Sequence, residues 1–329
     1  MTWNEAMCEA LVLACDPQAP RGRNPRVGCV IVDDRGQIIG RGFHRGSGTA
    51  HAEIAALEDA GDRARGATAV VSLEPCRHVG RTGPCVAALI DAGITRVVYA
   101  IDDPTDAGGG ASVLTEAGCE VIGGVMVEEA TAVNREWLIA SARGWPFVRL
   151  KMAVSIDGRV AGPAGEELAL TGEEARRYVH SLRASAQAVM VGTGTVLTDD
   201  PRLTVREAPV LAAGQPLRVA WGTRDLPSGA ALRDSDAPFH QCRTHDADAA
   251  LTELFDLGVR EVLVEGGPTV AGALLAADRV DEVIWLIAPI YLGQGPGAVL
   301  SPGLFRTLDV NSVDKVGNDV RIIAVPGRG

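Results

Sequence analysis

The stretch from His51 to Cys85, HAEIAALEDAGDRARGATAVVSLEPCRHVGRTGPC, decides the fold of the first half of the chain. Ala52–Ala60 has a helical pattern that Gly61 can end. Ala67–Leu73 is a short apolar run that predicts a strand. A helix and a strand that alternate along a chain are typical of a layered α/β domain.

The same alternation continues on both sides of this stretch. Two strands joined by the turn Asp33-Asp34-Arg35-Gly36 precede it, and further helices and strands follow it. The predicted strands are 27–32, 37–43, 67–73, 96–101 and 120–125, and the predicted helices are 52–60, 86–92, 112–117 and 127–141. We therefore expect a three-layer α/β/α domain in the first half.

The pattern starts again after Arg143-Gly144-Trp145-Pro146, where Gly and Pro interrupt the chain before a new strand at Phe147. The second half predicts strands at 147–155, 188–192, 217–221, 261–265, 282–288 and 321–325, and helices at 172–186, 247–257 and 269–277. We expect two α/β domains, residues 1–145 and 146–329.

Composition and charge exclude several classes of protein. Hydrophobic content of 47% and charged content of 22% are typical of a folded globular chain. The net charge is −11, and residues 1–145 carry 13 basic and 19 acidic residues. We expect no nucleic-acid partner, because binding to a phosphate backbone requires clustered Lys and Arg.

Three features predict a cytoplasmic protein with no membrane partner. The most apolar run, Val283–Leu292, is well short of the about 18 residues that span a bilayer. Met1–Met7 has neither the basic nor the long apolar segment of a signal peptide. The seven cysteines are scattered and odd in number, which indicates reduced thiols.

One His-Ala-Glu and two Pro-Cys pairs occur in the order found in zinc deaminases, which carry H-x-E and then P-C-x-x-C. Two thiolates and a neutral imidazole offset the charge of zinc and leave a position for a water, whose pKa falls toward about 7. Eight residues separate the two cysteines here instead of two, and the alternative is a surface histidine near buried cysteines. We predict His51, Cys76 and Cys85 as zinc ligands and Glu53 as the catalytic group that moves protons.

Residues 74–85, EPCRHVGRTGPC, resemble the motif E-P-C-x-H-x-G-[RK]-T-x-P-C of the bifunctional riboflavin-biosynthesis deaminase/reductase family. Asn24–Val30 and Gly42-Phe43-His44 are similar to two further segments of its deaminase domain, which has a cytidine-deaminase-like fold. The family often has Asn where this chain has Thr105. The resemblance implies that the pyrimidine substrate and its phosphate contact Asn24, His44, His78, Arg81 and Asp103.

Val264–Thr269 (VEGGPT) predicts a phosphate site in the second half. It combines a strand end, two glycines and a proline in the first turn of a helix, whose N-terminal N–H groups bind anions. The alternative is an ordinary strand-to-helix turn. Gly192-Thr193-Gly194 lacks the third glycine of a dinucleotide fingerprint and does not predict a Rossmann fold.

Three stretches of the second half, Leu150–Arg159, Gly194–Arg206 and Glu265–Pro268, are similar to the reductase half of the same family, which has a dihydrofolate-reductase-like α/β fold. The resemblance implies NADPH contacts from Ala153, Ala169, Thr195, Asp199, Gly267, Pro268, Thr269 and Ala273. It implies substrate contacts from Glu167, Arg183, Leu203, Arg206 and Glu265, with Lys151 as polar support.

Two of these positions depart from the family, because Glu167 and Ala169 stand where it usually has Ser and Trp. A methyl group at Ala169 removes the aromatic wall that would stack on the cofactor.

The resemblance implies a bifunctional enzyme of riboflavin biosynthesis with Zn²⁺ and NADPH as cofactors. The first domain would hydrolytically deaminate 2,5-diamino-6-ribosylamino-4(3H)-pyrimidinone 5′-phosphate. The second would reduce the ribosyl group of 5-amino-6-(5-phosphoribosylamino)uracil to ribityl. The resemblance also implies a homo-oligomer, either a dimer or a tetramer.

Three alternatives remain open at this point. One is a zinc deaminase of another base whose reductase-like domain has lost activity. Another is a zinc-containing nucleic-acid editing or binding module. A purely structural zinc site is the third.

Overall fold

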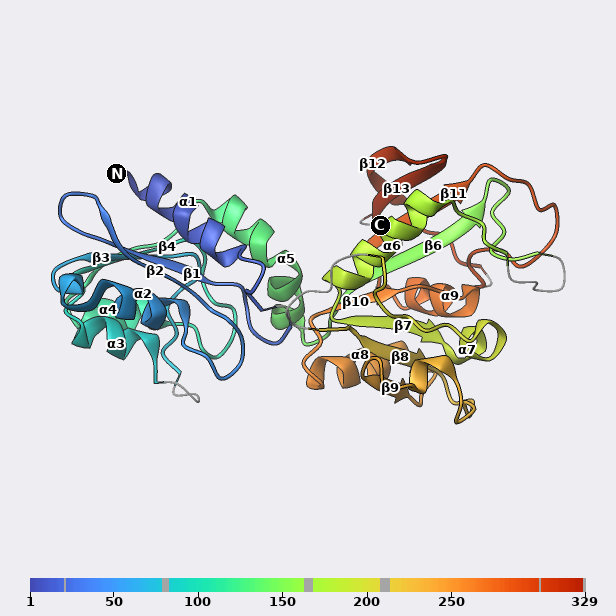
Figure 1. Ribbon diagram of the computed structural model, residues 1–329, viewed down its shortest axis with the longest axis horizontal. Coiled ribbons are helices and arrows are strands. Elements are labelled where there is room, and N and C mark those ends of the chain that lie inside the picture. Colours follow the sequence, from blue (N-terminus) through green and yellow to red (C-terminus); the bar gives the residue numbers. More distant parts are fainter. Residues whose placement is uncertain (21, 79–82, 163–167, 208–213, 302, 328–329) are drawn as a thin grey trace. The chain divides into compact units, whose positions relative to one another are not determined.

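The computed structural model describes residues 1–329 except 21, 79–82, 163–167, 208–213, 302 and 328–329 (Figure 1). The chain divides into two compact units, Met1–Arg143 and Gly144–Gly329. No helix in the described ranges has the length and apolar character that a membrane span requires.

The first unit is built on a five-stranded mixed sheet in the order β2-β1-β3-β4-β5. β1 is antiparallel to both β2 and β3, whereas β3, β4 and β5 run parallel. The strands are β1 (Gly28–Val32), β2 (Ile38–Phe43), β3 (Thr68–Val71), β4 (Arg96–Tyr99) and β5 (Glu120–Ile122).

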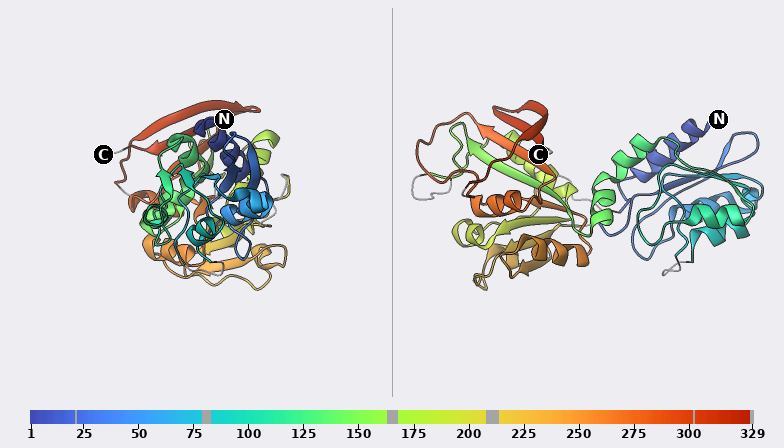
Figure 2. Two further views of the ribbon diagram at one scale, coloured as in Figure 1. Left: turned by 90° about the vertical axis from the view of Figure 1, so that its left-hand side faces the viewer. Right: turned by 180° about the vertical axis from the view of Figure 1, so that it is seen from behind.

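Five helices cover this sheet on both faces. α1 and α5 lie on one face and α2, α3 and α4 on the other, and the view from behind shows the same layers (Figures 1 and 2). The three-layer α/β/α arrangement is therefore confirmed. The helices are α1 (Trp3–Ala14), α2 (Ala52–Ala60), α3 (Cys85–Asp91), α4 (Gly110–Glu116) and α5 (Val127–Arg143).

Close contact between α1 and the sheet depends on a glycine. A Cβ built on Gly28 would lie 1.9 Å from the carbonyl oxygen of Ala10, so only glycine allows the helix to pack at this distance. β1 is buried along its whole length, which explains its continuous apolar sequence.

The second unit is built on an eight-stranded mixed sheet in the order β12-β13-β11-β6-β10-β7-β8-β9. The six strands from β11 to β9 in this order run parallel, and β13 and β12 add an antiparallel edge. The strands are β6 (Phe147–Ser155), β7 (Ala188–Gly192), β8 (Leu217–Trp221), β9 (Phe239–Cys242), β10 (Glu261–Val264), β11 (Glu282–Ala288), β12 (Leu308–Val316) and β13 (Asp319–Pro326).

Helices cover both faces of the second sheet too. Along β7, Ala188 and Met190 pack with α8 and α9, whereas Val189 and Val191 pack with α6 and α7. Burial on both faces makes β7 apolar at every position. The helices are α6 (Glu173–Ser185), α7 (Thr193–Asp199), α8 (Ala247–Asp256) and α9 (Pro268–Ala276).

Six of the described elements were absent from the sequence prediction: α1, α7, β9, β12 and the 3₁₀ helices Gly61–Ala64 and Ala231–Arg233. α1 begins with a capping box, in which Thr2 Oγ1 accepts from the backbone N–H of Glu5 and the Glu5 carboxylate accepts from that of Thr2. β12 is largely exposed and rich in polar residues, so burial leaves little periodic signal in its sequence.

Candidate active sites

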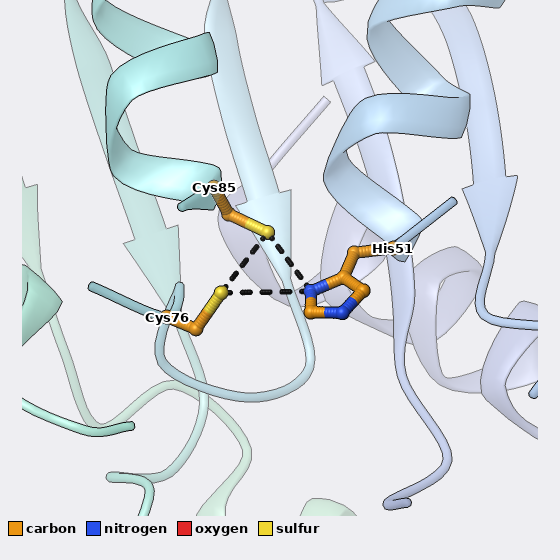
Figure 3. A group of neighbouring side chains, drawn as sticks. All are labelled: His51, Cys76 and Cys85. Carbon is orange, nitrogen blue, oxygen red and sulfur yellow. Dashed lines mark hydrogen bonds between the residues drawn. The ribbon is translucent and has the colours of Figure 1, made fainter. Parts of the chain in front are cut away.

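The three predicted zinc ligands meet where the carboxyl end of β3 faces the first turns of α2 and α3. His51 caps α2, Cys76 lies in the loop after β3, and Cys85 is the first residue of α3. His51 Nδ1 lies 3.2 Å from Cys85 Sγ and 3.5 Å from Cys76 Sγ, and the sulfurs are 3.4 Å apart (Figure 3). The fold therefore brings together three residues that are distant in the sequence.

This donor set fits a zinc ion. A tetrahedral site with bonds of about 2.0–2.3 Å has ligand separations of about 3.3–3.8 Å, close to those found here. The hydrogen bond from Cys85 lowers the pKa of Cys76 to about 4 against the effect of burial, and the interaction with His51 adds to it. The same hydrogen bond and burial raise the pKa of Cys85. The two thiols thus carry one negative charge and one proton between them. A bound dication would displace that proton and leave both sulfurs as thiolates.

Glu53 follows the histidine in the first turn of α2 and is only 4% exposed. Burial raises the pKa of its carboxyl to about 7. Cys76, His51 and Cys85 are among the groups that act on this carboxyl. Glu53 is therefore a proton-binding group beside the cluster, as the sequence predicts.

Asn24 and His44 lie together next to the cluster. Asn24 Nδ2 donates to His44 Nε2 at 2.9 Å, and His44 Nδ1 donates to the carbonyl of Ala50 at 3.1 Å. The His44 ring meets that of His51 edge to face, with 5.2 Å between centroids. Burial lowers the pKa of His44, which agrees with a neutral ring that accepts at Nε2.

Glu74 organises the loop that carries Asp103. Its carboxylate accepts hydrogen bonds from the backbone N–H groups of Asp103, Gly109 and Ala111 at 3.3, 3.0 and 2.9 Å. Thr105 donates to the Asp103 carboxylate from its backbone and from its hydroxyl, at 2.9 and 2.7 Å. The sequence did not predict this role of Glu74, because its partners lie far along the chain.

α5 anchors the segment that contains Asn24. Asn134, at a kink in the helix, accepts from Arg26 N at 2.9 Å and donates to Arg26 O at 2.8 Å. Trp137 Nε1 donates to the carbonyl of Arg23 at 3.0 Å. Asn134 and Trp137 are both buried. The sequence did not predict their roles, because their partners lie far along the chain.

The other two predicted substrate residues of the first unit lie between Cys76 and Cys85 in the sequence. His78 is exposed in the loop after Cys76. Arg81 lies outside the described residues.

Charged side chains of the second unit gather around Glu265, just after β10. Arg183 makes a bidentate contact with the Glu265 carboxylate, in which Nε donates to Oε1 at 2.5 Å and Nη2 donates to Oε2 at 3.0 Å. Lys151 Nζ lies 3.5 Å from Oε2. Burial alone would raise the pKa of Glu265, but the charges of Arg183 and Lys151 outweigh it and lower the pKa to about 2. The carboxylate is therefore charged and fixed in orientation.

Thr204 links Arg183 to the predicted residues Leu203 and Arg206. Arg183 Nη1 donates to the Thr204 carbonyl, and Arg206 Nη1 to the Thr204 hydroxyl, both at 3.1 Å. Leu203 is buried with a φ of 54°. Arg206 is exposed and, in the described part of the chain, makes no ion pair, so its charge is free for an anion.

A cavity of about 410 Å³ opens at the carboxyl ends of β7 and β8. The first turn of α9 forms one wall, where Gly266 has a φ of 88° and the N–H of Gly267 donates to Thr195 Oγ1 at 3.3 Å. The predicted cofactor residues Thr195, Gly267, Pro268, Thr269 and Ala273 all line it.

The cavity suits a phosphorylated dinucleotide. No side chain caps the N-terminus of α9 among the described residues, and a helix N-terminus is the favoured place for a pyrophosphate. Trp221 also lines the cavity and is 5% exposed, and its indole Nε1 has no hydrogen-bond partner among the described residues. A buried donor of this kind indicates a bound group that would accept its hydrogen bond.

Three predicted cofactor residues that the structure describes do not line this cavity. Asp199 is exposed at the end of α7, and Ala169 is exposed. Ala153 packs with α6, on the face of the sheet opposite α9. Glu167 lies outside the described residues.

Comparison with known proteins agrees with these two sites. Residues 1–101 match the cytidine and deoxycytidylate deaminase zinc-binding region, and residues 146–322 match the RibD C-terminal domain. The riboflavin biosynthesis protein RibD of Mycobacterium tuberculosis is 44% identical, over 98% of this chain and 97% of its own. That of Escherichia coli is 38% identical, over 95% of this chain and 96% of its own.

Two solved structures match this chain over nearly its whole length. Acinetobacter baumannii RibD has a TM-score of 0.88 at 36% identity, covering 99% of both chains. A deaminase/reductase from Thermotoga maritima has a TM-score of 0.85 at 31% identity, also covering 99% of both chains.

Fold, site and comparisons together define a zinc-binding deaminase domain joined to a reductase domain. The chain belongs to the RibD family of riboflavin biosynthesis proteins. It is a bifunctional enzyme of that pathway, and the alternatives of an inactive reductase-like half or a nucleic-acid module are not favoured.

Proposed function

We propose that the first unit hydrolytically deaminates 2,5-diamino-6-ribosylamino-4(3H)-pyrimidinone 5′-phosphate, and that the second reduces the ribosyl group of 5-amino-6-(5-phosphoribosylamino)uracil to ribityl with NADPH. The Thermotoga maritima relative is described as a diaminohydroxyphosphoribosylaminopyrimidine deaminase/5-amino-6-(5-phosphoribosylamino)uracil reductase. Similarity over the full length of both chains supports the same pair of substrates here.

The observation that carries the deaminase assignment is the buried carboxyl of Glu53 beside the His51, Cys76 and Cys85 cluster. Zinc held there would acidify a water molecule that attacks the amidine-like ring carbon. Glu53 would take one proton from the attacking water and pass it to the ring nitrogen. It would then take the remaining hydroxyl proton and pass it to the amine, which leaves as ammonia while the ring carbonyl forms. A group whose pKa is near 7 suits both steps.

Asn24 and His44 form a fixed polar pair beside the reacting groups. Because His44 Nε2 is satisfied by Asn24, the Asn24 amide oxygen is left to meet the pyrimidine. Asp103, held by Glu74 and Thr105, lies at the carboxyl end of β4 and offers a carboxylate to the ring substituents or the ribose. We place the substrate's 5′-phosphate near His78 and Arg81.

In the second unit, NADPH would supply the hydride to the ring-opened imine form of the sugar. Glu265 orients the substrate through its fixed carboxylate, and Lys151 Nζ lies 3.5 Å from Glu265 Oε2. Arg183 is neutralised by Glu265, whereas Arg206 has no carboxylate partner among the described residues. We therefore assign the 5′-phosphate of this substrate mainly to Arg206.

A pair of assays tests the proposal. Zinc-loaded protein should release ammonia from the diaminopyrimidine phosphate and oxidise NADPH when given the aminouracil phosphate. Glu53→Gln should abolish ammonia release and leave NADPH oxidation unchanged, because Glu53 belongs to the first unit. Wild-type protein without either activity contradicts the proposal.

A further inference from the structure

The segment of residues 200–206, which follows α7 and carries Leu203 and Arg206, has no regular secondary structure, yet its middle is buried. Residues 203–205 are each at most 4% exposed. Asp200 and Leu203 have φ values of 42° and 54°, which residues other than glycine rarely adopt. A backbone of this kind persists only where its surroundings hold it in place. The groups that hold the segment therefore decide where Arg206 lies.

Side chains from two other parts of the second unit supply hydrogen bonds to this segment. Gln215 Oε1 accepts from the backbone N–H of Val205 at 2.8 Å, and Gln215 Nε2 donates to the carbonyl of Val205 at 3.0 Å. His180, on α6, accepts from the backbone N–H of Arg206 at its Nδ1, at 3.2 Å. Two consecutive residues of the segment are thus held by side chains, as a neighbouring strand would hold them.

His180 is 5% exposed and is suited to the role of an acceptor. Burial lowers the pKa of its ring, and the charges of Arg183 and Arg206 add to this effect, while Glu207 and Glu265 oppose it. The ring is therefore neutral at neutral pH, with the Nδ1 lone pair available to accept. His180 thereby connects α6 to the residue whose guanidinium is assigned to the substrate phosphate.

The position of the Arg206 guanidinium follows from these backbone contacts. The side chain is exposed, and its Nη1 donates to the hydroxyl of Thr204, which belongs to the same segment. A shift of the segment would therefore carry the guanidinium with it. Phosphate recognition by arginine depends on the orientation of its planar set of donors, so such a shift would weaken the contact.

We propose that His180 and Gln215 are positioning residues of the reductase, which hold the backbone of residues 200–206 so that Arg206 meets the 5′-phosphate of the substrate. The inference rests on the proposed function of the second unit. Both side chains act through the backbone of the segment. Their loss should therefore reduce the affinity for the phosphorylated substrate and leave hydride transfer nearly unchanged.

The test measures NADPH oxidation with the aminouracil phosphate as substrate. His180→Phe keeps a ring but removes the acceptor, and it should raise the KM of this substrate about 5- to 100-fold, the effect of one buried donor without a partner. The kcat and the KM of NADPH should change little. His180→Asn has an amide oxygen as far from the backbone as Nδ1 and should recover most of the affinity, whereas the longer His180→Gln should not. Ser181→Ala, exposed on the same helix, should follow wild type.

A double-mutant cycle with Arg206→Ala shows whether His180 acts through this arginine. In a chain that already lacks the guanidinium, His180→Phe should raise the KM no further. Gln215→Leu should behave in the same way, and it leaves α6 intact, so it repeats the test if His180→Phe does not fold. Additive losses, or a lower kcat at an unchanged KM, overturn the inference while the reductase function stands. Wild-type protein that does not oxidise NADPH with this substrate overturns both.

Discussion

At the scale of single residues, the described part of the chain has two clusters that combine His and Cys with metal-ligand spacing, and their chemistry differs. His51, Cys76 and Cys85 include a thiol whose pKa is lowered to about 4. His240, Cys242 and Glu253 also lie together, but burial raises the pKa of Cys242 to about 12, and His240 Nε2 is already 2.6 Å from Glu253. A thiolate is the form that binds metal, so the first cluster is the stronger ligand set.

The first prediction concerns zinc content, measured by atomic emission on purified protein. Wild-type protein should carry about one zinc ion per chain, as expected for one such site. Cys76→Ser should remove it, because a serine hydroxyl is a poor substitute for a thiolate. His240→Ala is the matched control and should keep the metal. Loss of zinc in the control alone would place the metal at the second cluster.

The residues that we propose to bind zinc and move protons could be found in the sequence because they form a short, ordered pattern. Glu74 and Asn134 could not be predicted in the same way. Their roles depend on contacts with backbone or glycine positions far away in the chain, such as Glu74 with Gly109 and Ala111. A single sequence carries no local signal for such contacts.

At the scale of elements, α5 is a functional part of the first unit. It lies outside the ranges that match the two families, yet it fixes the segment with Asn24. Asn134 is 3% exposed and satisfies both backbone groups of Arg26, so it sets the position of that segment without touching the cluster itself.

The second prediction follows from this anchor. Asn134→Ala should destabilise the first unit by about 1–3 kcal/mol, because it leaves buried backbone groups of Arg26 unpaired. It should raise the KM of deamination more than it lowers kcat, while zinc content and NADPH oxidation stay unchanged. Thr131→Ala, at an exposed position of the same helix, should behave like wild type. A stability loss with an unchanged KM would show that Asn134 has only a structural role.

Most strands and helices followed from hydrophobic pattern, and several bounds, including those of α2, β6, β7, β8 and β11, agree with the prediction. Two of the missed elements, β9 and β12, lack a clear hydrophobic pattern, whereas α1 has one and was missed all the same. β9 has four residues, FHQC, and its pattern reaches neither alternation nor an apolar run. Because β9 was missing, no place at the sheet edge was predicted for His245, which lines the cavity of the second unit.

At the scale of the whole molecule, each unit has its own sheet and its own core, and the acid response of the second can be predicted. Asp157 accepts hydrogen bonds from Ser155 Oγ and from the backbone of Leu292 and Gly293, which join the end of β6 to the loop after β11. The bond from Ser155, with those from Leu292 and Gly293, lowers the pKa of Asp157 to about 2.

The third prediction gives the direction of this pH dependence. The folded pKa lies below the value of about 3.9 in an unfolded chain, so the stabilisation is complete above pH 4 and is lost as the pH falls toward 2. Thermal unfolding of Asp157→Asn should therefore differ most from wild type above pH 4, with the difference disappearing near pH 2. Asp309→Asn, exposed on β12, is the control and should follow wild type at every pH. A constant difference for Asp157→Asn would contradict the assignment.

The homo-oligomeric state implied by the sequence stays a prediction. So do the domain bounds at residue 145, although the two units divide at Arg143 and Gly144.

The division into two units on one polypeptide also has a consequence for the cell. Each act of translation yields one deaminase and one reductase, so their numbers stay equal whatever the strength of the promoter or the lifetime of the messenger. Balance between the two consecutive reactions must then be set by their turnover numbers alone. Natural selection on flux would act on the kinetics of each unit and could not adjust their relative abundance while they share one reading frame.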